Sequence, residues 1–459
     1  MNGNRPRPAS AGSPPRRLLL RWLRAGMGIK RWLAAVFVGE FLLALAGGLV
    51  IRQIYRDVPA DAPAAVLFDL LSLQFLPLWL RPVVLLGTGL IIFLYGSWRL
   101  INVLLEPFRE REESLVELLY QRRWRARGPR IVAIGGGTGL STLLRGLKEQ
   151  TSNITAVVTV ADDGGSSGKL REELGVPPVG DIRNCIAALA DAEPAMARLM
   201  QYRFPANGKS KSTFEGHAFG NLLIAALTDV EGDFEEGVRQ SNRVLAVRGK
   251  VVPVAPEPMT LHAELADGTL VRGQSRIARA HDISQVWITP EDVPASRDAM
   301  TAVAAADLVV IGPGSLYTSI MPSLLVSDLR AALEATSAPR LFVCNVATQV
   351  GETEGFTLSQ HLAALRAHGL DHLVDAVIVN DNLSARAPAN YPAAPVTIDL
   401  PADATPPVLA RDVVDNDNAH HHDPRKLAAA IVDIYDRRLI SRSSGLRAAV
   451  RPAVGSGRR

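Results

Sequence analysis

The residues best suited to chemistry form a short polar block in the middle of the chain. Residues 162–168 read Asp-Asp-Gly-Gly-Ser-Ser-Gly, which joins two carboxylates to a glycine- and serine-rich loop. Backbone N–H groups and hydroxyls of such a loop can hold phosphate, and carboxylates beside it can hold a divalent metal ion that bridges phosphate oxygens. The block predicts a phosphate-bearing ligand, with Ser166 and Ser167 on the phosphate and Asp162 and Asp163 on a metal ion, for which magnesium is the candidate.

Two further polar groups stand where helices are expected to begin. Residues 180–184 read Gly-Asp-Ile-Arg-Asn, and residues 216–221 read Gly-His-Ala-Phe-Gly-Asn. His217 and Asn221 are four residues apart, so on a helix they share a face and could present an imidazole and an amide to one ligand. Asp181 could line the same crevice, or it could simply cap its helix. The candidate crevice residues are Asp181, Arg183, Asn184, His217 and Asn221.

Two glycine-rich turns each follow a short apolar run. The run 130–134 leads into Gly-Gly-Gly-Thr-Gly at 135–139, and the run 307–311 leads into Gly-Pro-Gly-Ser-Leu-Tyr-Thr-Ser at 312–319. Glycine lets the backbone turn and approach a ligand closely, and the start of a helix offers free N–H groups to an anion. The first turn lacks the third glycine of the dinucleotide fingerprint. An NAD-dependent dehydrogenase is therefore disfavoured.

These motifs must be positioned by a sheet. Four apolar runs, at 154–161, 307–311, 341–344 and 376–379, end in polar or glycine-rich residues. The carboxyl ends of parallel strands meet at one edge of a doubly wound sheet, where ligands bind. We therefore predict an α/β fold with a Rossmann-like doubly wound parallel sheet and one crevice, with Asn345 on its rim. Alternation on either side of Ala-Asp-Gly at 266–268 predicts a hairpin, hence a small β-rich insertion over about 250–290.

The histidine triplet and the two cysteines carry no predicted chemistry. Residues 420–422 are all His and precede Asp423 and Pro424, a pair that can open a helix, so we interpret the triplet as a loop rather than a metal site. Cys185 and Cys344 lie in apolar runs. This placement excludes a disulfide-rich scaffold and a Cys-based zinc site, and it favours a reducing compartment. No catalytic residue is assigned.

Composition limits the class of protein. The chain has 459 residues, of which 47% are hydrophobic and 21% are charged, as expected of two or three folded units. The net charge is +4, but the segments 1–32 and 122–130 together hold thirteen basic residues and no acidic one. The basicity is confined to these two patches, which flank apolar stretches. The charge therefore does not indicate a nucleic-acid-binding fold.

The apolar stretches predict a membrane anchor. Residues 33–51 and 83–105 are each long enough to cross a hydrocarbon core of ~30 Å. We interpret them as a transmembrane hairpin, the alternative being two buried core helices. Because the basic patches lie outside the two spans, we expect a multi-pass protein of the cell membrane with both termini and the main domain cytoplasmic. The predicted parts are a basic, partly disordered leader (1–32), the hairpin (33–105), a charged linker (106–128), the main domain (129–437) and a disordered tail (438–459).

Five motifs, at 135–141, 160–168, 180–184, 216–221 and 311–319, together resemble those of the gluconeogenesis factor family, also called YvcK-like. That family is related to CofD, the 2-phospho-L-lactate transferase of coenzyme F420 synthesis. The resemblance covers about 129–437 and implies a Rossmann-like fold. Carried over residue by residue, it implies that the nucleotide is bound by Gly135, Gly136, Gly137, Thr138, Gly139, Gly312, Gly314, Ser315, Tyr317 and Thr318.

The resemblance implies one of two functions. The YvcK branch, which the motifs at 135–141 and 160–168 follow, is associated with UDP-sugar binding, growth on gluconeogenic carbon and cell shape. The leading interpretation is a membrane-tethered, cytoplasmic nucleotide-sugar-binding regulator that links carbon metabolism to cell-envelope synthesis. Its protein partner stays open, as does a homo-oligomeric state. The alternative, from the CofD branch, is a magnesium-dependent transferase that moves a phospholactyl-type group from a nucleotide-linked donor. The commonest family members look soluble, so the membrane hairpin is a departure.

Overall fold

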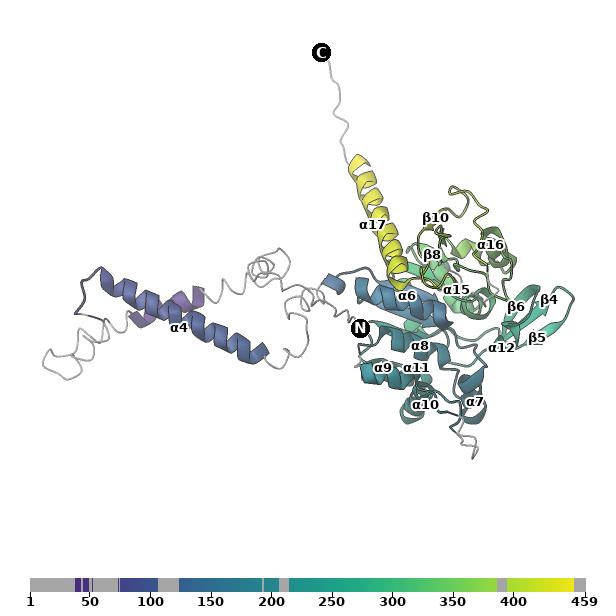
Figure 1. Cartoon of the computed structure of the whole chain (residues 1–459), viewed down its shortest axis with the longest axis horizontal. Coiled ribbons are helices and arrows are strands. Elements are labelled where there is room, and N and C mark those ends of the chain that lie inside the picture. Colours follow the sequence, from purple (N-terminus) through teal and green to yellow (C-terminus); the bar gives the residue numbers. More distant parts are fainter. Residues whose placement is uncertain are drawn as a thin grey trace, which may run out of the picture. The chain divides into compact units, whose positions relative to one another are not determined.

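The chain divides into two compact units, Met1–Arg123 and Trp124–Arg459 (Figure 1). The computed structural model describes residues 38–42, 44–48, 52, 73, 75–105, 124–191, 194–205, 214–385 and 394–449. The second unit holds every polar motif found in the sequence.

A seven-stranded sheet forms the centre of the second unit, in the order β10-β9-β8-β7-β1-β2-β3. All neighbouring strands are parallel. The chain first builds β1, β2 and β3 outward, then returns to the other side of β1 to build β7 and the remaining strands. The point at which the order reverses therefore lies between β1 and β7. The strands are β1 (Ile131–Gly135), β2 (Ile154–Val158), β3 (Lys250–Pro253), β7 (Leu308–Ile311), β8 (Arg340–Val343), β9 (Ala376–Asn380) and β10 (Val408–Arg411).

Helices cover the sheet because its central strands are apolar on both faces. Every residue of β1 and β7 is buried, as expected of strands in a parallel sheet. α6 contacts β1 and β2, α8 and α11 contact β3, α13 contacts β2 and β3, and α17 contacts α6. The helices are α6 (Gly137–Gln150), α7 (Gly165–Leu174), α8 (Gly180–Leu189), α9 (Pro194–Gln201), α10 (Phe219–Glu231), α11 (Phe234–Val244), α13 (Arg297–Ala304), the π-helix η2 (Leu316–Ile320), α14 (Met321–Leu324), α15 (Ser327–Ala335), α16 (Leu358–Ala367), the 3-10 helix η3 (Asp371–Leu373) and α17 (Pro424–Ala449).

A second, antiparallel sheet of three strands, in the order β5-β4-β6, follows the main-sheet strand β3. It consists of β4 (Thr260–Leu265), β5 (Leu270–Arg272) and β6 (Ile283–Thr289), with the short helix α12 (Gln274–Ile277) between β5 and β6. Gly268, with a φ of +82°, turns the predicted hairpin between β4 and β5. The predicted parallel α/β sheet and β-rich insertion are confirmed. The predicted start of the insertion is wrong, because residues 250–253 pair with β2 as the edge of the main sheet.

The outer edge of β3 is closed by a side chain. The Asn242 amide, on α11, donates to the carbonyl of Val251 at 2.8 Å and accepts from the N–H of Val251 at 3.2 Å. The next outward-facing residue of the strand is Pro253, which has no N–H to offer. The backbone groups that an edge strand usually leaves free are therefore occupied or missing here.

In the first unit, one helix among the described residues is long and apolar enough to cross a membrane. α4 (Leu80–Leu105) contains the stretch Leu80–Arg99, whose mean hydropathy is 1.6 and none of which is buried. It coincides with the predicted second span. Of the predicted first span, 33–51, only short helical pieces within Val38–Gly48 belong to the described residues. The structure thus shows one candidate span, and the predicted two-span hairpin is not shown.

Both boundaries of the main domain differ from the prediction. The domain begins at Trp124, because the Arg125 guanidinium pairs with Glu149 at 2.8 Å and the Arg125 carbonyl accepts from the N–H of Ser152. At the other end, α17 continues to Ala449, so the predicted tail is helical over 438–449. This stretch contains no proline and carries basic residues, which a helix C-terminus favours. The leader and residues 106–123 lie outside the described residues.

A fragment that starts at Trp124 should be soluble without detergent, whereas the full chain should sediment with membranes. A second fragment that starts at Gly128 loses the contacts of Arg125 and should unfold with a free energy about 1–2 kcal/mol lower in urea. Ultracentrifugation of cell lysates and urea titration followed by circular dichroism measure both. A full chain that stays in the supernatant would contradict the membrane anchor, and equal stability of the fragments would contradict the assigned boundary.

Candidate functional site

The two glycine turns meet at the point where the strand order reverses. A Cβ atom added to Gly139, in the first turn of α6, would lie 2.7 Å from the carbonyl oxygen of Pro313 and 2.9 Å from the Cα of Gly314. The turns therefore touch backbone to backbone. Gly137 adopts a φ of +63°, a left-handed conformation that favours glycine. The carboxyl ends of β1 and β7 thus open into one crevice, as expected of a doubly wound sheet.

The crevice contains a cavity of about 430 Å³. One wall is the start of α6, whose N-cap Gly136 has no capping side chain of its own. The N–H of Gly137 donates to Asp181, while the rest of the first turn and the positive end of the helix dipole face the cavity. The other walls come from the segments after β7, β8 and β10. The lining residues are Gly136, Gly137, Thr138, Gly139, Thr142, Gly314, Ser315, Ser319, Asn345, Val346, Ala347, Thr348, Gln349, Asn418, His420, His421 and His422.

Six of the twelve residues predicted to contact the nucleotide or its phosphate line this cavity: Gly136, Gly137, Thr138, Gly139, Gly314 and Ser315. Asn345, predicted on the crevice rim, lines it as well. Asn345 also bonds both the N–H and the carbonyl of Gly314, at 3.2 and 2.9 Å, so it holds the second turn in place. Gly135 is the last residue of β1, and Gly312 directly follows β7.

Two predicted residues lie behind the cavity wall instead of on it. The Thr318 hydroxyl donates to the Glu352 carboxylate, and the N–H of Tyr317 donates to the same group at 3.3 Å. Glu352 is 3% exposed, and burial raises its pKa to about 7. Burial likewise raises the pKa of Tyr317 to about 12, and the Tyr317 hydroxyl donates to the carbonyl of Ile283. Tyr317 and Thr318 thus support η2 rather than face a ligand.

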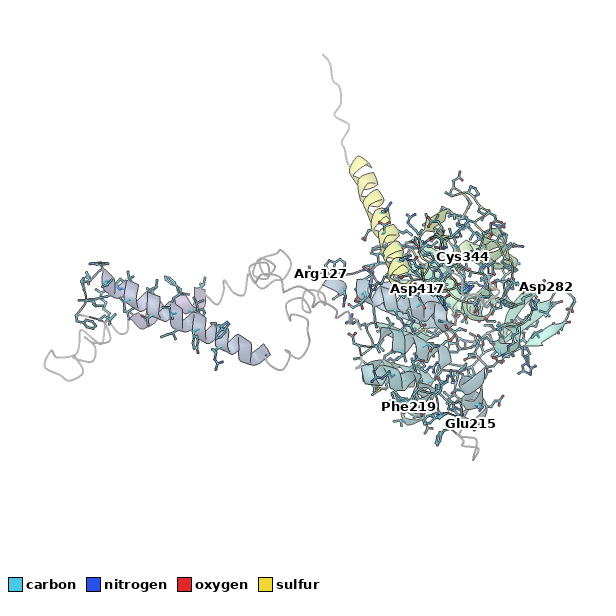
Figure 2. The ribbon with its side chains drawn as sticks, viewed as in Figure 1. Arg127, Glu215, Phe219, Asp282, Cys344 and Asp417 are labelled. Atoms are coloured by element: carbon cyan, nitrogen blue, oxygen red, sulfur yellow. The ribbon has the colours of Figure 1, made fainter. Side chains whose placement is uncertain are left out.

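The histidine loop and Gln349 are lining residues that the sequence analysis did not assign. The loop that holds Asn418 and His420–His422 follows β10 and reaches the same sheet edge as Cys344, which follows β8; Figure 2 marks Cys344 and Asp417 of this loop. Burial lowers the pKa of His422 to about 4, so its ring is neutral at physiological pH. Gln349 donates to the Ser315 hydroxyl at 2.9 Å. The sequence feature that could have predicted these residues is their position after β8 and β10.

A second polar cluster lies on the β2 side of the same edge. The Ser166 hydroxyl is bonded by three groups, His217 Nδ1 at 3.2 Å, the Asn221 amide at 3.0 Å and the N–H of Ala218 at 3.3 Å. The side chains of Ser166, His217 and Asn221 are at most 5% exposed. The predicted pairing of His217 and Asn221 is therefore seen, with Ser166 between them.

The two carboxylates predicted to hold a metal ion, Asp162 and Asp163, have different surroundings. Asp163 is exposed and accepts from the N–H of Ser275 at 2.8 Å, which ties its loop to the insertion. Asp181 accepts from the N–H of Gly137 at the cavity wall. Burial raises the pKa of Asp162 and raises that of Asp181 to about 7. Asp162 interacts electrostatically with both Asp163 and Asp181.

The remaining predicted crevice residues, Arg183 and Asn184, lie in the first turns of α8. The Arg183 guanidinium donates through Nη2 to Asn184 Oδ1 at 2.9 Å. Burial, and secondarily the nearby Arg203, lowers the pKa of Arg183. Among the described residues, no group of three His, Cys, Asp or Glu side chains is arranged as a metal site. Asp162 and Asp181 provide oxygen atoms near the start of α6, and such ligands could hold magnesium together with a phosphate group.

The substitution Asp181→Asn should stabilise the protein at high pH. Because the Asp181 pKa of about 7 exceeds its ordinary value of 3.8, the folded state binds the proton more tightly, and the stability that this gives is lost as pH rises from 4 to 7. Asp181→Asn should therefore raise the free energy of unfolding by roughly 1–3 kcal/mol at pH 8 and leave it unchanged near pH 4. Urea unfolding at both pH values measures this, with Asp292→Asn on the exposed surface as control. A variant that is less stable than wild type at pH 8 would contradict the assignment.

Substitutions of Gly137 and Gly139 should differ in their effects on ligand binding and on the stability of the fold. Gly137→Val strains a left-handed residue and places a branched side chain at the cavity wall, so it should abolish nucleotide binding. Gly139→Ala instead pushes a methyl group into Pro313 and should mainly lower stability, by about 1–3 kcal/mol. Isothermal calorimetry with UDP-glucose and urea unfolding distinguish the two effects. Wild-type affinity in a folded Gly137→Val variant would remove this turn from the site.

Comparison with known proteins identifies the family of the domain that contains the crevice. The family model described as 2-phospho-L-lactate transferase CofD matches residues 131–414. The gluconeogenesis factor of Bacillus subtilis is 43% identical over 314 residues, which cover 67% of this chain and 98% of that protein. A relative from Nostoc sp. is 43% identical over 436 residues, 90% of this chain and 92% of its own.

A solved structure shows the same fold. The crystal structure of a UPF0052 family member from Bacillus halodurans is 41% identical and superposes with a TM-score of 0.61, covering 67% of this chain and 99% of that one. The predicted resemblance is confirmed over the domain that carries the crevice. The chain belongs to the gluconeogenesis factor family, and residues 131–414 form its CofD-type domain.

Proposed function

We propose that this protein is a regulatory protein that binds a nucleotide-sugar of the UDP-sugar type. The observation that carries the proposal is the cavity at the β1/β7 reversal point, walled by two glycine turns and the uncapped start of α6. A diphosphate is the group that such a wall favours, because free N–H groups and the helix dipole stabilise negative charge without any lysine or arginine.

We infer the positions of the nucleobase and of the group linked to the nucleotide from the order of the strands. The segments after β8 and β10 provide amide, hydroxyl and neutral histidine groups, which can hydrogen-bond and stack with a nucleobase. On the opposite side of the diphosphate, Asp162, Ser166 and Asp181 lie toward β2. The group linked to the nucleotide would therefore extend over α7, α8 and α10.

The setting of the domain supports a regulator at the membrane. Relatives carry the name gluconeogenesis factor, which favours a link to carbon metabolism. The exposed apolar helix α4 favours a membrane tether, and the basic patches outside the predicted spans favour a cytoplasmic domain and termini. We extend the proposal to a role that couples carbon metabolism to cell-envelope synthesis and cell shape, through a protein partner at the membrane.

One observation favours a second function, a transferase. Asp162 and Asp181 lie together beside the N–H of Gly137, where a phosphate is expected. With magnesium bound between these carboxylates and the phosphates, charge that develops on a nucleotide leaving group would be neutralised. In the absence of turnover, the same carboxylates serve only to recognise the ligand. The motif type follows the regulator branch, which is why we favour binding without chemistry.

A panel of nucleotide-sugars separates the two functions. With full-length protein in detergent, we expect thermal stabilisation by a UDP-sugar, no product over many equivalents of ligand, and weaker binding in Asp162→Asn. Asp163→Asn is the matched control, because Asp163 bonds to the insertion and should leave affinity unchanged. Multiple turnovers that Asp162→Asn slows about 100-fold without loss of affinity would establish the transferase instead. Binding of no nucleotide-sugar would reject both functions.

A further inference from the structure

The polar cluster on the β2 side contains a buried arginine with unused donors. Arg183 is 5% exposed, and its Nε and Nη1 atoms have no hydrogen-bond partner among the described residues. Its stem crosses to the start of α10, where a Cβ on Gly220 would lie 2.8 Å from its Cγ. Buried charged donors are normally paired, because leaving them unpaired costs far more than leaving a neutral group unpaired.

The carboxylates nearby do not fulfil this role. Asp162 and Asp181 attract Arg183 electrostatically, but no ion pair within 4 Å joins the guanidinium to either of them. A second cation, Arg203, lies close enough to repel Arg183, and it donates to the carbonyl of Gly216 at 3.3 Å. The Nε and Nη1 donors of Arg183 therefore have no acceptor among the described residues.

Three helices begin around this arginine, and none of their N-cap residues caps its helix with its own side chain. Gly164, Val179 and Ala218 are the N-cap residues of α7, α8 and α10. Ser166, Ser167 and Gly220 bring the three starts together. Each start contributes partial positive charge, which stabilises an anion nearby.

We propose that the group linked to the nucleotide bears its own negative charge, a carboxylate, and that Arg183 binds this charge among the starts of α7, α8 and α10. The inference rests on the proposed nucleotide-sugar binding and specifies its ligand class. The diphosphate occupies the cavity beside α6, and the linked sugar crosses Asp181 toward Arg183. The ligand is thus an acidic nucleotide-sugar, anchored at two separate negative groups.

Matched ligand pairs test the proposal by calorimetry on the full-length protein in detergent. UDP-glucose is compared with UDP-glucuronate, and UDP-N-acetylglucosamine with UDP-N-acetylmuramate; the second member of each pair adds one carboxylate, at a different position on the sugar. We expect about tenfold tighter binding of the acidic member in at least one pair, as a charge-assisted bond gives.

Arg183→Gln should remove this preference while the neutral member of the pair still binds, which also shows that the variant is folded. Arg297→Gln, an exposed arginine on α13, removes the same charge elsewhere and should keep the preference. Equal affinity for neutral and acidic members of both pairs in wild type would overturn the inference and leave the proposed function standing. A preference that survives in Arg183→Gln would also overturn it. Failure of all four ligands to bind would reject the proposed function itself.

Discussion

The structure depends on one backbone contact, that of Gly139 with Pro313 and Gly314. Strands β1 and β7 are neighbours in the sheet, yet their following segments diverge to opposite halves of the domain. Their turns can approach this closely only where no side chain stands between them, since even one methyl group would overlap a carbonyl oxygen. The contact brings a helix start and a second loop to the same place, and it creates a crevice without requiring any charged residue at its centre.

Around that contact, the polar groups differ in the free energy that their burial costs. At the centre, backbone N–H groups face the cavity, and their partial charge is part of the fold. Ionisable side chains lie to the side, where Asp181 is buried and Arg183 has unpaired donors, and beneath the wall, where Glu352 is buried against η2. Buried ionisable groups of this kind reduce stability, so their concentration at one sheet edge is typical of a binding site rather than of a core.

The sequence predicted the sheet and the crevice because each strand is a short apolar run that ends in glycine or polar residues. It did not predict that Asp181 also acts on Asp162, because the two residues are nineteen positions apart in sequence and only the fold brings α8 against β2. The histidine loop was missed because it follows β10, a strand with only one fully buried residue, Val408, which gives little apolar signal. The hydrogen bonds from η2 to the buried Glu352 depend on tertiary contacts, which no local sequence pattern encodes.

The closed edge of β3 has a consequence for crowding. The proposed membrane tether would confine copies of this protein to two dimensions and raise their local concentration, so a free strand edge would meet identical edges on neighbouring copies and could polymerise with them. Asn242 occupies the N–H and the carbonyl of Val251, and Pro253 has no N–H, so neither outward-facing residue of that edge can donate to another strand. Copies of this protein can therefore accumulate beside one another without this edge extending into a shared sheet, and any assembly that forms there must be selected by side chains.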